Sequence, residues 1–172
     1  ETAELISVAS TEGLNGIGAA FQRDLRDRVV QWPDPGRPRP VHYNCWEAVY
    51  FDHKLDTLAE FATRAAALGA ERFVLDDGWF GARRHDRAGL GDWVVSHQAW
   101  PQGLRVLADT VRDLGMEFGL WVEPEMVNPR SELYEQHPDW VIHEPGRDRR
   151  EERQQLVLDV LRGIYIGVPC LC

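Results

Sequence analysis

Lysine is almost absent from the sequence. Lys54 is the only one among 172 residues, and 28 acidic residues outnumber 19 lysines and arginines, which gives a formal net charge of −9. Binding to nucleic acids or anionic membranes depends on clustered positive charge, so we expect neither as a partner. Long apolar runs are also missing, because none approaches the roughly 18–20 residues of a membrane-spanning helix. These absences argue against a nucleic-acid-binding protein and against a membrane-spanning one.

Cysteine and histidine are too few and too scattered for a structural cross-link or a metal site. Cys45, Cys170 and Cys172 are odd in number and lack the CxxC spacing, and the six histidines form no HxxxH or HxH pair. The pattern argues against a disulfide framework and against a zinc site. We therefore expect no metal and a reducing, cytoplasmic setting.

Residues 1–40 differ in composition from the rest of the chain. "ELISVAS" is compatible with a strand, and "GIGAAFQRDLRDRVV" has apolar residues at helical spacing. "QWPDPGRPRP" then places four prolines and a glycine in ten residues, which is typical of a stiff, extended linker. Because the chain begins at Glu1 without an initiator Met, we expect it to be a piece of a longer protein.

After the linker, strand and helix patterns alternate. We predict strands at 41–48, 72–77, 117–123 and 155–160, and helices at 52–68, 104–114 and 131–137. "LGAERFVLDD" and "LGMEFGLWVE" repeat one order: the end of a helix, Leu-Gly, an acidic residue, an apolar strand and a carboxylate. Such repeats predict a parallel sheet in an α/β fold, either a doubly wound sheet or a (β/α)8 barrel. No GxGxxG follows the first strand, so the barrel is favoured, with about four of its eight strands present.

Carboxylates follow all four predicted strands, and tryptophans lie near three of them. The acids are Glu47, Asp76, Asp77, Glu123, Glu125 and Asp159, and the tryptophans are Trp46, Trp79 and Trp121. Function gathers at the carboxyl ends of parallel strands. Carboxylates that accept hydrogen bonds from hydroxyls, beside indole faces, are typical of sugar-binding sites.

Each of these residues also has a purely structural interpretation. Asp77-Gly78 is a common turn signal, Trp121 is compatible with a barrel core, and Glu125 with an exposed ion pair to Arg130 worth about 0–1 kcal/mol. A metal site of Asp77, His85 and Glu123 is only weakly indicated, because no spacing within it is diagnostic.

Five motifs resemble the α-galactosidases of glycoside hydrolase family 36. They are "NCWEAVYFD", "FVLDDGWFG", "GDWVVSHQAWPQGL", "FGLWVEPEMVNPRSELYEQHPDWVIH" and "RQQLVLD", in order, and the resemblance covers about residues 12 to 159. It implies a β-sandwich domain before a (β/α)8 barrel, so that residues 1–40 are the end of the sandwich with a connecting helix and linker. Residues 41–159 are then the first βα units of the barrel. It also implies retaining hydrolysis of terminal α-galactose from oligosaccharides such as raffinose and melibiose, with no cofactor.

The resemblance assigns substrate-binding roles to five residues. Trp46 and Trp121 match tryptophans that line the galactose pocket, and Asp76 and Asp77 match a pair that binds the hydroxyls on C4 and C6. Arg153 matches an arginine just before the expected fourth strand. Galactose differs from glucose by its axial 4-hydroxyl, and a hydrogen bond to a charged group contributes about 1.5–3 kcal/mol, enough to select one epimer.

No catalytic residue is assigned. The family's nucleophile lies in a Lys-x-Asp motif on a later strand, whereas Lys54, in the first predicted helix of the barrel segment, is followed by Leu55 and Asp56. Two departures from the family are Cys45, at a small polar position, and residues 160–172, a tail that matches nothing in it and suggests a frameshift or a truncated gene. A galactosyltransferase of the raffinose-synthase type and a noncatalytic galactose-binding module remain alternatives. We expect the full-length protein to be homo-oligomeric.

Overall fold

The structure is a computed structural model that describes residues 4–31, 34, 36–149 and 151–162. The chain divides into two compact units, Glu1–Arg39 and Pro40–Cys172, beside the proline-rich segment. In the described part of the chain, no helix is both long and apolar enough to cross a membrane.

The first unit holds one long helix. α1 (Gly13–Asp24) continues into a π-helical turn, η1 (Leu25–Val29). The Arg28 guanidinium extends this turn's contacts by donating to Asp24 (Nε to Oδ1, 3.0 Å) and to Glu4 (Nη1 to Oε2, 2.9 Å). The stretch "ELISVAS", which is compatible with a strand, forms none in the structure. A lone extended segment has no neighbouring strand to bond within its unit.

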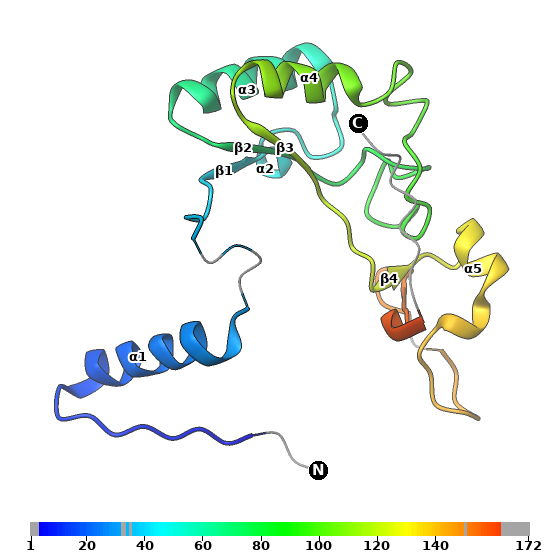
Figure 1. The fold of residues 1–172 in the computed structure, drawn as a ribbon. Coiled ribbons are helices and arrows are strands. Elements are labelled where there is room, and N and C mark those ends of the chain that lie inside the picture. The colour runs from blue at the N-terminus through cyan, green and yellow to red at the C-terminus, as the bar shows by residue number, and fades with distance from the viewer. Residues whose placement is uncertain (1–3, 32–33, 35, 150, 163–172) are drawn as a thin grey trace. The chain divides into compact units, whose positions relative to one another are not determined.

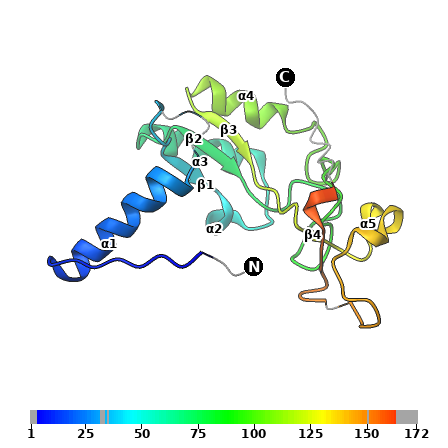
Figure 2. The ribbon, with the colours of Figure 1, turned by 60° about the horizontal axis from the view of Figure 1, so that its bottom comes forward.

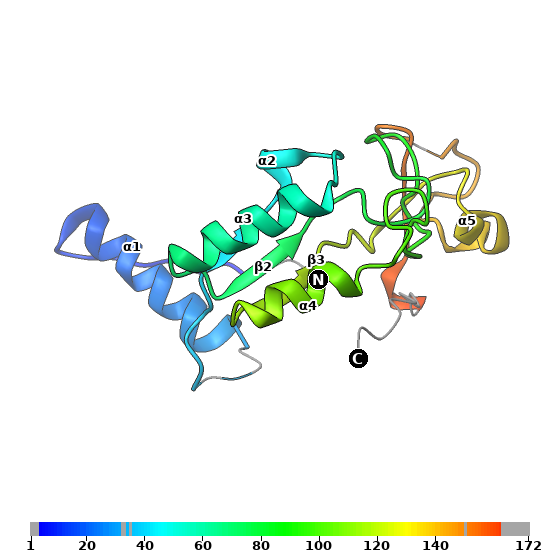
Figure 3. The same cartoon turned by 90° about the horizontal axis from the view of Figure 1, so that it is seen from above.

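The second unit is built on a parallel sheet in the order β1-β2-β3, with helices between its strands. β1 (His42–Asn44) pairs with β2 (Arg72–Leu75), and β2 pairs with β3 (Glu117–Leu120), with Tyr43, Phe73 and Phe118 in register. α3 (Leu55–Ala67) joins the first two strands, and α4 (Arg105–Asp113) joins the second and third. The two helices lie side by side on the same face of the sheet (Figures 1 and 3).

The repeated helix–Leu-Gly–strand pattern is confirmed. α3 and α4 are each followed by a glycine with a left-handed backbone, Gly69 at φ +90° and Gly115 at φ +80°. The next amide in each case bonds back to the helix, Ala70 N to Ala65 O at 3.0 Å and Met116 N to Val111 O at 3.2 Å. Glycine adopts this conformation without strain, so both helices stop at the position from which the next strand begins.

One main core fills the space between the sheet and the two helices. Phe73 and Leu75 of β2 point into it, and they meet the buried faces of the helices. Those faces consist of Leu58, Ala62 and Ala65 from α3 and Leu107, Ala108 and Val111 from α4. Each fully buried leucine of this kind contributes about 1.5–3 kcal/mol. The core therefore fixes the ends of β2 and β3, where the predicted site lies.

The predicted fourth parallel strand is wrong. β5 (Leu156–Val157) pairs antiparallel with β4 (Met126–Val127), in a separate two-stranded sheet. This sheet has its own small core of Val127, Val141, Leu156 and Leu158, and it lies with α5 (Glu132–Gln136) beyond the end of β3 (Figure 2). An apolar run such as "QLVLD" carries no information about its partner strand, and the nearest partner along the chain was β4.

Several other predicted boundaries also shift. The first strand ends at Asn44, and Trp46 and Glu47 lie on a short helix, α2 (Trp46–Val49), instead of in the strand. Two 3-10 turns, η2 (Pro138–Trp140) and η3 (Val160–Arg162), complete the elements. The predicted tail, residues 160–172, lies outside the described residues except for η3.

Candidate functional site

The two aspartates that follow β2 are buried at the end of the sheet. Asp76 is 7% exposed and Asp77 is 5% exposed, and the strand ends at Leu75 just before them. Because regular strand neighbours point to opposite faces, a strand that continued through this pair would direct the two carboxylates to opposite sides. The backbone amide of Asp77 donates to Asp76 Oδ1 at 2.7 Å, which fixes the two groups relative to each other.

Asp77 is held by an arginine that sequence reasoning did not single out. Arg83 Nε donates to Asp77 Oδ1 at 2.9 Å and to Oδ2 at 3.0 Å, and Arg83 Nη2 donates to Oδ2 at 2.7 Å. Both side chains are buried, at 5% and 7% exposure, and Arg83 Nη1 also donates to the Ala88 carbonyl at 2.9 Å. A planar guanidinium matches a carboxylate in this bidentate way, so the Asp77 side chain is held in one orientation.

Asp76 is tied to the end of β1 and to the predicted tryptophan. Asn44 Nδ2 donates to Asp76 Oδ2, and the other end of the same amide, Oδ1, accepts from the Trp46 backbone amide at 2.8 Å. The Cys45 Sγ accepts from the Asp76 amide at 3.4 Å. Burial raises the pKa of the Cys45 thiol, so that this side chain is a neutral packing group. Asn44 was missed because an Asn before a turn has an ordinary structural role.

Trp46 and Trp121 are both half-buried and belong to different aromatic groups. Trp46 packs edge-on against Tyr50 and Phe51, with ring centroids 5.1 Å apart in both pairs. Trp121 follows β3, where its amide donates to the Leu75 carbonyl at 3.0 Å. Its own carbonyl accepts from Trp79 Nε1 at 2.9 Å. Trp121 thus lies directly beside the strand that ends in the two aspartates.

Arg153 lies in a tight turn of the second sheet, close to the acids that follow β3. Burial raises the pKa of the Glu123 carboxyl, and the neighbouring Glu125 carboxylate raises it further. Arg153 and Arg83 act in the opposite direction on that pKa, and Asp77 again raises it. The Glu123 carboxyl therefore lies within electrostatic reach of both arginines and of Asp77.

Two of the acids that were expected at the ends of parallel strands lie outside this cluster. Glu47 is exposed on α2, where it accepts from the Tyr50 hydroxyl at 2.9 Å, and Asp159 follows β5 of the antiparallel sheet. The convergence of four strand ends is therefore wrong, and only β2 and β3 bring acids together. Among the described residues, no three or more His, Cys, Asp and Glu side chains are arranged to hold a metal ion, so the weak metal alternative is not assembled.

His53 and a second arginine, Arg84, lie beside the backbone that directly follows the aspartates. Arg84 donates to the Gly78 carbonyl through Nη1 and to the Gly81 carbonyl through Nη2, the latter at 3.2 Å. Both ring nitrogens of His53 are buried, with no hydrogen-bond partner in the described structure. Burial, aided by the Arg84 charge, lowers the pKa of His53 to about 4, so His53 is neutral near pH 7.

The arrangement is a cluster of buried, fixed carboxylates with half-buried indoles at its margin. It joins Asp76 and Asp77 directly, Trp46 through Asn44, and Glu123 through its charge interactions with Arg83 and Arg153. Such a site can accept hydrogen bonds from the hydroxyls of a neutral polar ligand.

Several known proteins are similar to this chain in sequence. A sequence model of the melibiase family matches residues 1–164. The chain is 49% identical over 156 residues to an α-galactosidase of Escherichia coli, and 50% identical over 162 residues to the α-galactosidase AgaA of Geobacillus stearothermophilus. These matches cover 91% and 94% of this chain, and the chain spans 22% of the length of each relative.

Solved structures give the same result. The crystal structure of GH36 α-galactosidase AgaA from Geobacillus stearothermophilus matches with a TM-score of 0.78 at 51% identity, covering 88% of this chain and 21% of that one. A variant of the same enzyme in complex with raffinose matches with the same TM-score at 50% identity, covering the same shares of the two chains.

Proposed function

Because the chain belongs to the melibiase family, whose sequence model covers residues 1–164, we propose that it forms one wall of the galactose pocket of an α-galactosidase. The observation that carries the proposal is the buried aspartate pair at the end of β2, fixed by Arg83 and Asn44. Similarity to enzymes that are named α-galactosidases supports the choice of sugar, since two variants of AgaA were crystallised with stachyose and with raffinose.

In this proposal, Asp76 and Asp77 accept hydrogen bonds from the hydroxyls on C4 and C6 of a terminal galactose. A carboxylate offers about four acceptor sites. Asp76 uses one site on each oxygen, whereas Asp77 uses one on Oδ1 and two on Oδ2, so the site that Asp77 retains for a sugar hydroxyl is on Oδ1. Trp46 and Trp121 cover the apolar C–H surfaces of the sugar, and Arg153 donates from the opposite margin. The pocket then rejects glucose because its equatorial 4-hydroxyl leaves a buried, charged acceptor without a donor.

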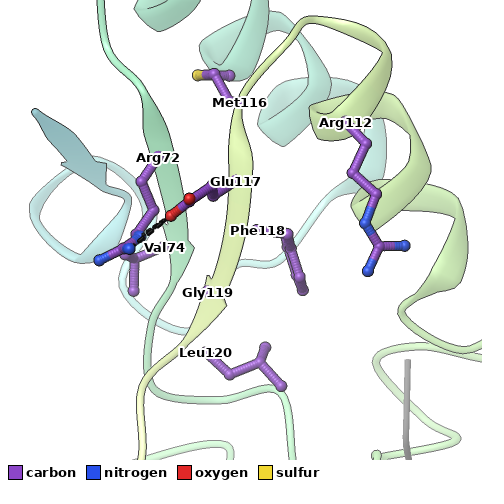
Figure 4. A pocket seen from close by; sticks show the side chains of 8 residues that line it. All are labelled: Arg72, Val74, Arg112, Met116, Glu117, Phe118, Gly119 and Leu120. Carbon is purple, nitrogen blue, oxygen red and sulfur yellow. Dashed lines mark hydrogen bonds and ion pairs between the residues drawn. The ribbon is translucent and has the colours of Figure 1, made fainter. Parts of the chain in front are cut away.

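We further propose that β1, β2 and β3 are the first strands of a (β/α)8 barrel, preceded by the end of a β-sandwich domain. The parallel order with both helices on one face supports a barrel. A hollow opens at β3, where Phe118, Gly119 and Leu120 line it together with Arg72 and Glu117, whose ion pair ties β3 to β2 (Figure 4). In the described part of the chain no strand occupies the edge of β3 away from β2, so a further barrel strand of the longer protein fits there.

The chain supplies binding and not chemistry. Retaining hydrolysis needs two carboxyl groups about 5–5.5 Å apart, one as nucleophile and one as acid and base. Asp76 and Asp77 are assigned to sugar binding in this proposal, and the one Lys-x-Asp in the sequence, Lys54-Leu55-Asp56, lies at the start of α3 and not at the end of a strand. The 172-residue chain by itself is therefore expected to give no turnover of an aryl α-galactoside. The cytoplasmic setting and the homo-oligomeric state of the longer protein stay predictions from sequence.

The test is an exchange enzyme, in which this chain replaces the segment of the Geobacillus stearothermophilus AgaA with which it aligns. We expect the exchange enzyme to hydrolyse raffinose, and Asp77→Asn, which keeps the shape but removes the charge, to raise KM about tenfold to a hundredfold. Glu117→Gln, in the half-exposed ion pair of the sheet, is the matched control and should leave KM unchanged.

Two outcomes would contradict the proposal. One is a folded exchange enzyme without turnover, and the other is an Asp77→Asn variant with unchanged KM and unchanged inhibition by galactose. Product analysis with raffinose and excess sucrose distinguishes the alternatives, because a hydrolase releases free galactose whereas a galactosyltransferase of the raffinose-synthase type moves galactose onto the sugar.

A further inference from the structure

Asn128 is a buried side chain that joins two segments far apart in the sequence. It follows β4 directly and is 3% exposed. Its Nδ2 donates to the Arg87 carbonyl at 2.9 Å and to the Gln154 carbonyl at 3.0 Å, and its Oδ1 accepts from the Arg130 amide at 2.9 Å. A side-chain amide has two donor hydrogens, and here each one holds a different loop.

The first of these loops carries the arginine that binds Asp77. It runs from Arg83 to Gly91, and the Arg83 side chain donates hydrogen bonds to Asp77 and, at 2.9 Å, to Ala88 O. The carbonyl that Asn128 holds belongs to Arg87, one residue before Ala88, and the Asn128 amide donates to Leu90 O at 2.8 Å. Asn128 thus fixes the same stretch of backbone on which the Arg83 guanidinium rests.

The second segment is a strained turn that carries Arg153. Glu152 and Gln155 exchange two backbone hydrogen bonds of 3.0 Å, and the two residues between them have left-handed backbones, Arg153 at φ +50° and Gln154 at φ +60°. A two-residue turn of this kind normally contains Asn-Gly, because side chains are disfavoured at positive φ. Such a turn persists only where its surroundings hold it.

Two side chains hold this turn from outside. Asn128 Nδ2 bonds the Gln154 carbonyl within it, and Gln155 Nε2 donates to the Asp86 carbonyl at 2.9 Å, which ties the turn to the Arg83 loop. The Glu123 carboxyl interacts electrostatically with both Arg153 and Arg83. The two hydrogen bonds therefore connect the strained turn to Asn128 and to the loop that carries Arg83.

We propose that Asn128 is a positioning residue that holds the Arg83–Asp77 loop and the Arg153 turn in register across the galactose pocket. The inference rests on the proposed function for its ligand, but its structural part stands on the contacts of Asn128 alone. Asn128 does not touch the sugar, and it acts by fixing the carbonyls of Arg87 and Gln154, which lie in the same two segments as Arg83 and Arg153.

The test compares Asn128→Ala and Asn128→Asp with Ser131→Ala in the exchange enzyme. Asn128→Asp keeps the volume and the acceptor but loses both donors. Ser131 lies in the same segment, where its Oγ donates to the Asn128 carbonyl at 2.8 Å and accepts from the Tyr134 amide at 3.1 Å without contacting the turn. We expect both Asn128 variants to raise KM for raffinose about tenfold to a hundredfold with little change in kcat, because misplaced binding groups lose that much. Ser131→Ala should lower stability alone.

A rescue variant separates positioning from general stability. Gln154→Gly removes the disfavoured side chain from the turn, so the turn no longer needs to be held. Adding Gln154→Gly to Asn128→Ala should therefore reverse most of the increase in KM. Equal KM changes in Asn128→Ala and Ser131→Ala, or no rescue by Gln154→Gly, would overturn the proposal.

Hydrogen exchange in the 172-residue chain keeps the test independent of turnover. Asn128→Ala should speed amide exchange in peptides covering 83–91 and 151–157, and Ser131→Ala should not. If the unsubstituted exchange enzyme is folded but inactive, the proposed function fails while this measurement still decides the role of Asn128. Unchanged exchange in both peptides would overturn it.

Discussion

The two halves of the sheet unit are built on different principles. In the helix–strand repeats from Leu55 to Leu120, contacts follow from apolar spacing and a capping glycine, and the elements pack in sequence order. In the segment from Val122 to Asp159, strands of two residues are held by side chains that reach distant carbonyls, such as Gln155 Nε2 to Asp86 O across 69 positions. The site lies where the two kinds of structure meet. The repeats fix the position of the aspartate pair, and the irregular segment contributes Arg153 and Asn128.

The largest effect is expected where the buried ion pair joins the repeats to the site. Arg83→Ala leaves the Asp77 carboxylate buried and unpaired, and should lower the free energy of unfolding by about 3–5 kcal/mol. Glu117→Ala breaks the Arg72–Glu117 pair, whose side chains are 35% and 39% exposed, and should lose only about 0–1 kcal/mol. Urea unfolding of the 172-residue chain, followed by tryptophan fluorescence, measures both. Equal losses would mean that the Asp77–Arg83 pair is solvated.

The next effect tests the regular half by itself. Leu107→Ala opens a cavity under α4 and should lose about 2–5 kcal/mol, whereas Val106→Ala at the neighbouring, 40% exposed position should change stability by no more than about 0.5 kcal/mol. Leu156→Ala, in the small core of the antiparallel sheet, should lie near the lower end of the Leu107 range because fewer side chains surround it. The same urea series decides, and a larger loss at Leu156 than at Leu107 would reverse the comparison.

A third effect depends on pH and arises from His53. Its pKa is about 4 in the folded chain against an ordinary value of 6.5, so the unfolded chain binds more protons between these values. Stability from this group is therefore complete above pH 6.5 and is lost as the pH falls towards 4, by at most about 1.4 kcal/mol per pH unit. In His53→Phe the urea midpoint should depend less on pH over this range. His97→Gln, at an exposed position, should leave the pH dependence of the midpoint unchanged. A slope that survives in His53→Phe would assign it to another group.

The smallest effect is a gain in the irregular segment. Gln154→Gly relieves a positive φ of +60° and should raise stability by about 0.5–1 kcal/mol, after the entropy that glycine loses on folding. Gln102→Gly, in an exposed turn where no such backbone is found, should lower stability by a similar amount. Thermal unfolding of the two variants gives the sign. A loss in both would show that the turn is not strained.

Sequence reasoning was accurate where the relevant interactions are local. The two helix–Gly–strand repeats, the parallel pairing of three strands and the ending of β2 at the aspartates all follow from residues within a few positions of one another. The partner of "QLVLD" was wrong because an apolar strand fits any partner of similar pattern. Arg83 was missed for a related reason, since "GARRHD" offers two adjacent arginines and no local signal tells which one reaches Asp77.

The sequence by itself determined the family, the repeats and the pair of acids at the end of β2. These depend on residue type and short spacing, which the chain displays directly. Only the tertiary structure decided how Asp77 is paired, that Asn44 links Asp76 to Trp46, and that Asn128 holds the turn of Arg153. Each of these contacts joins groups that the fold alone brings together, and a hydrogen bond depends on a distance and an angle that no sequence spacing specifies.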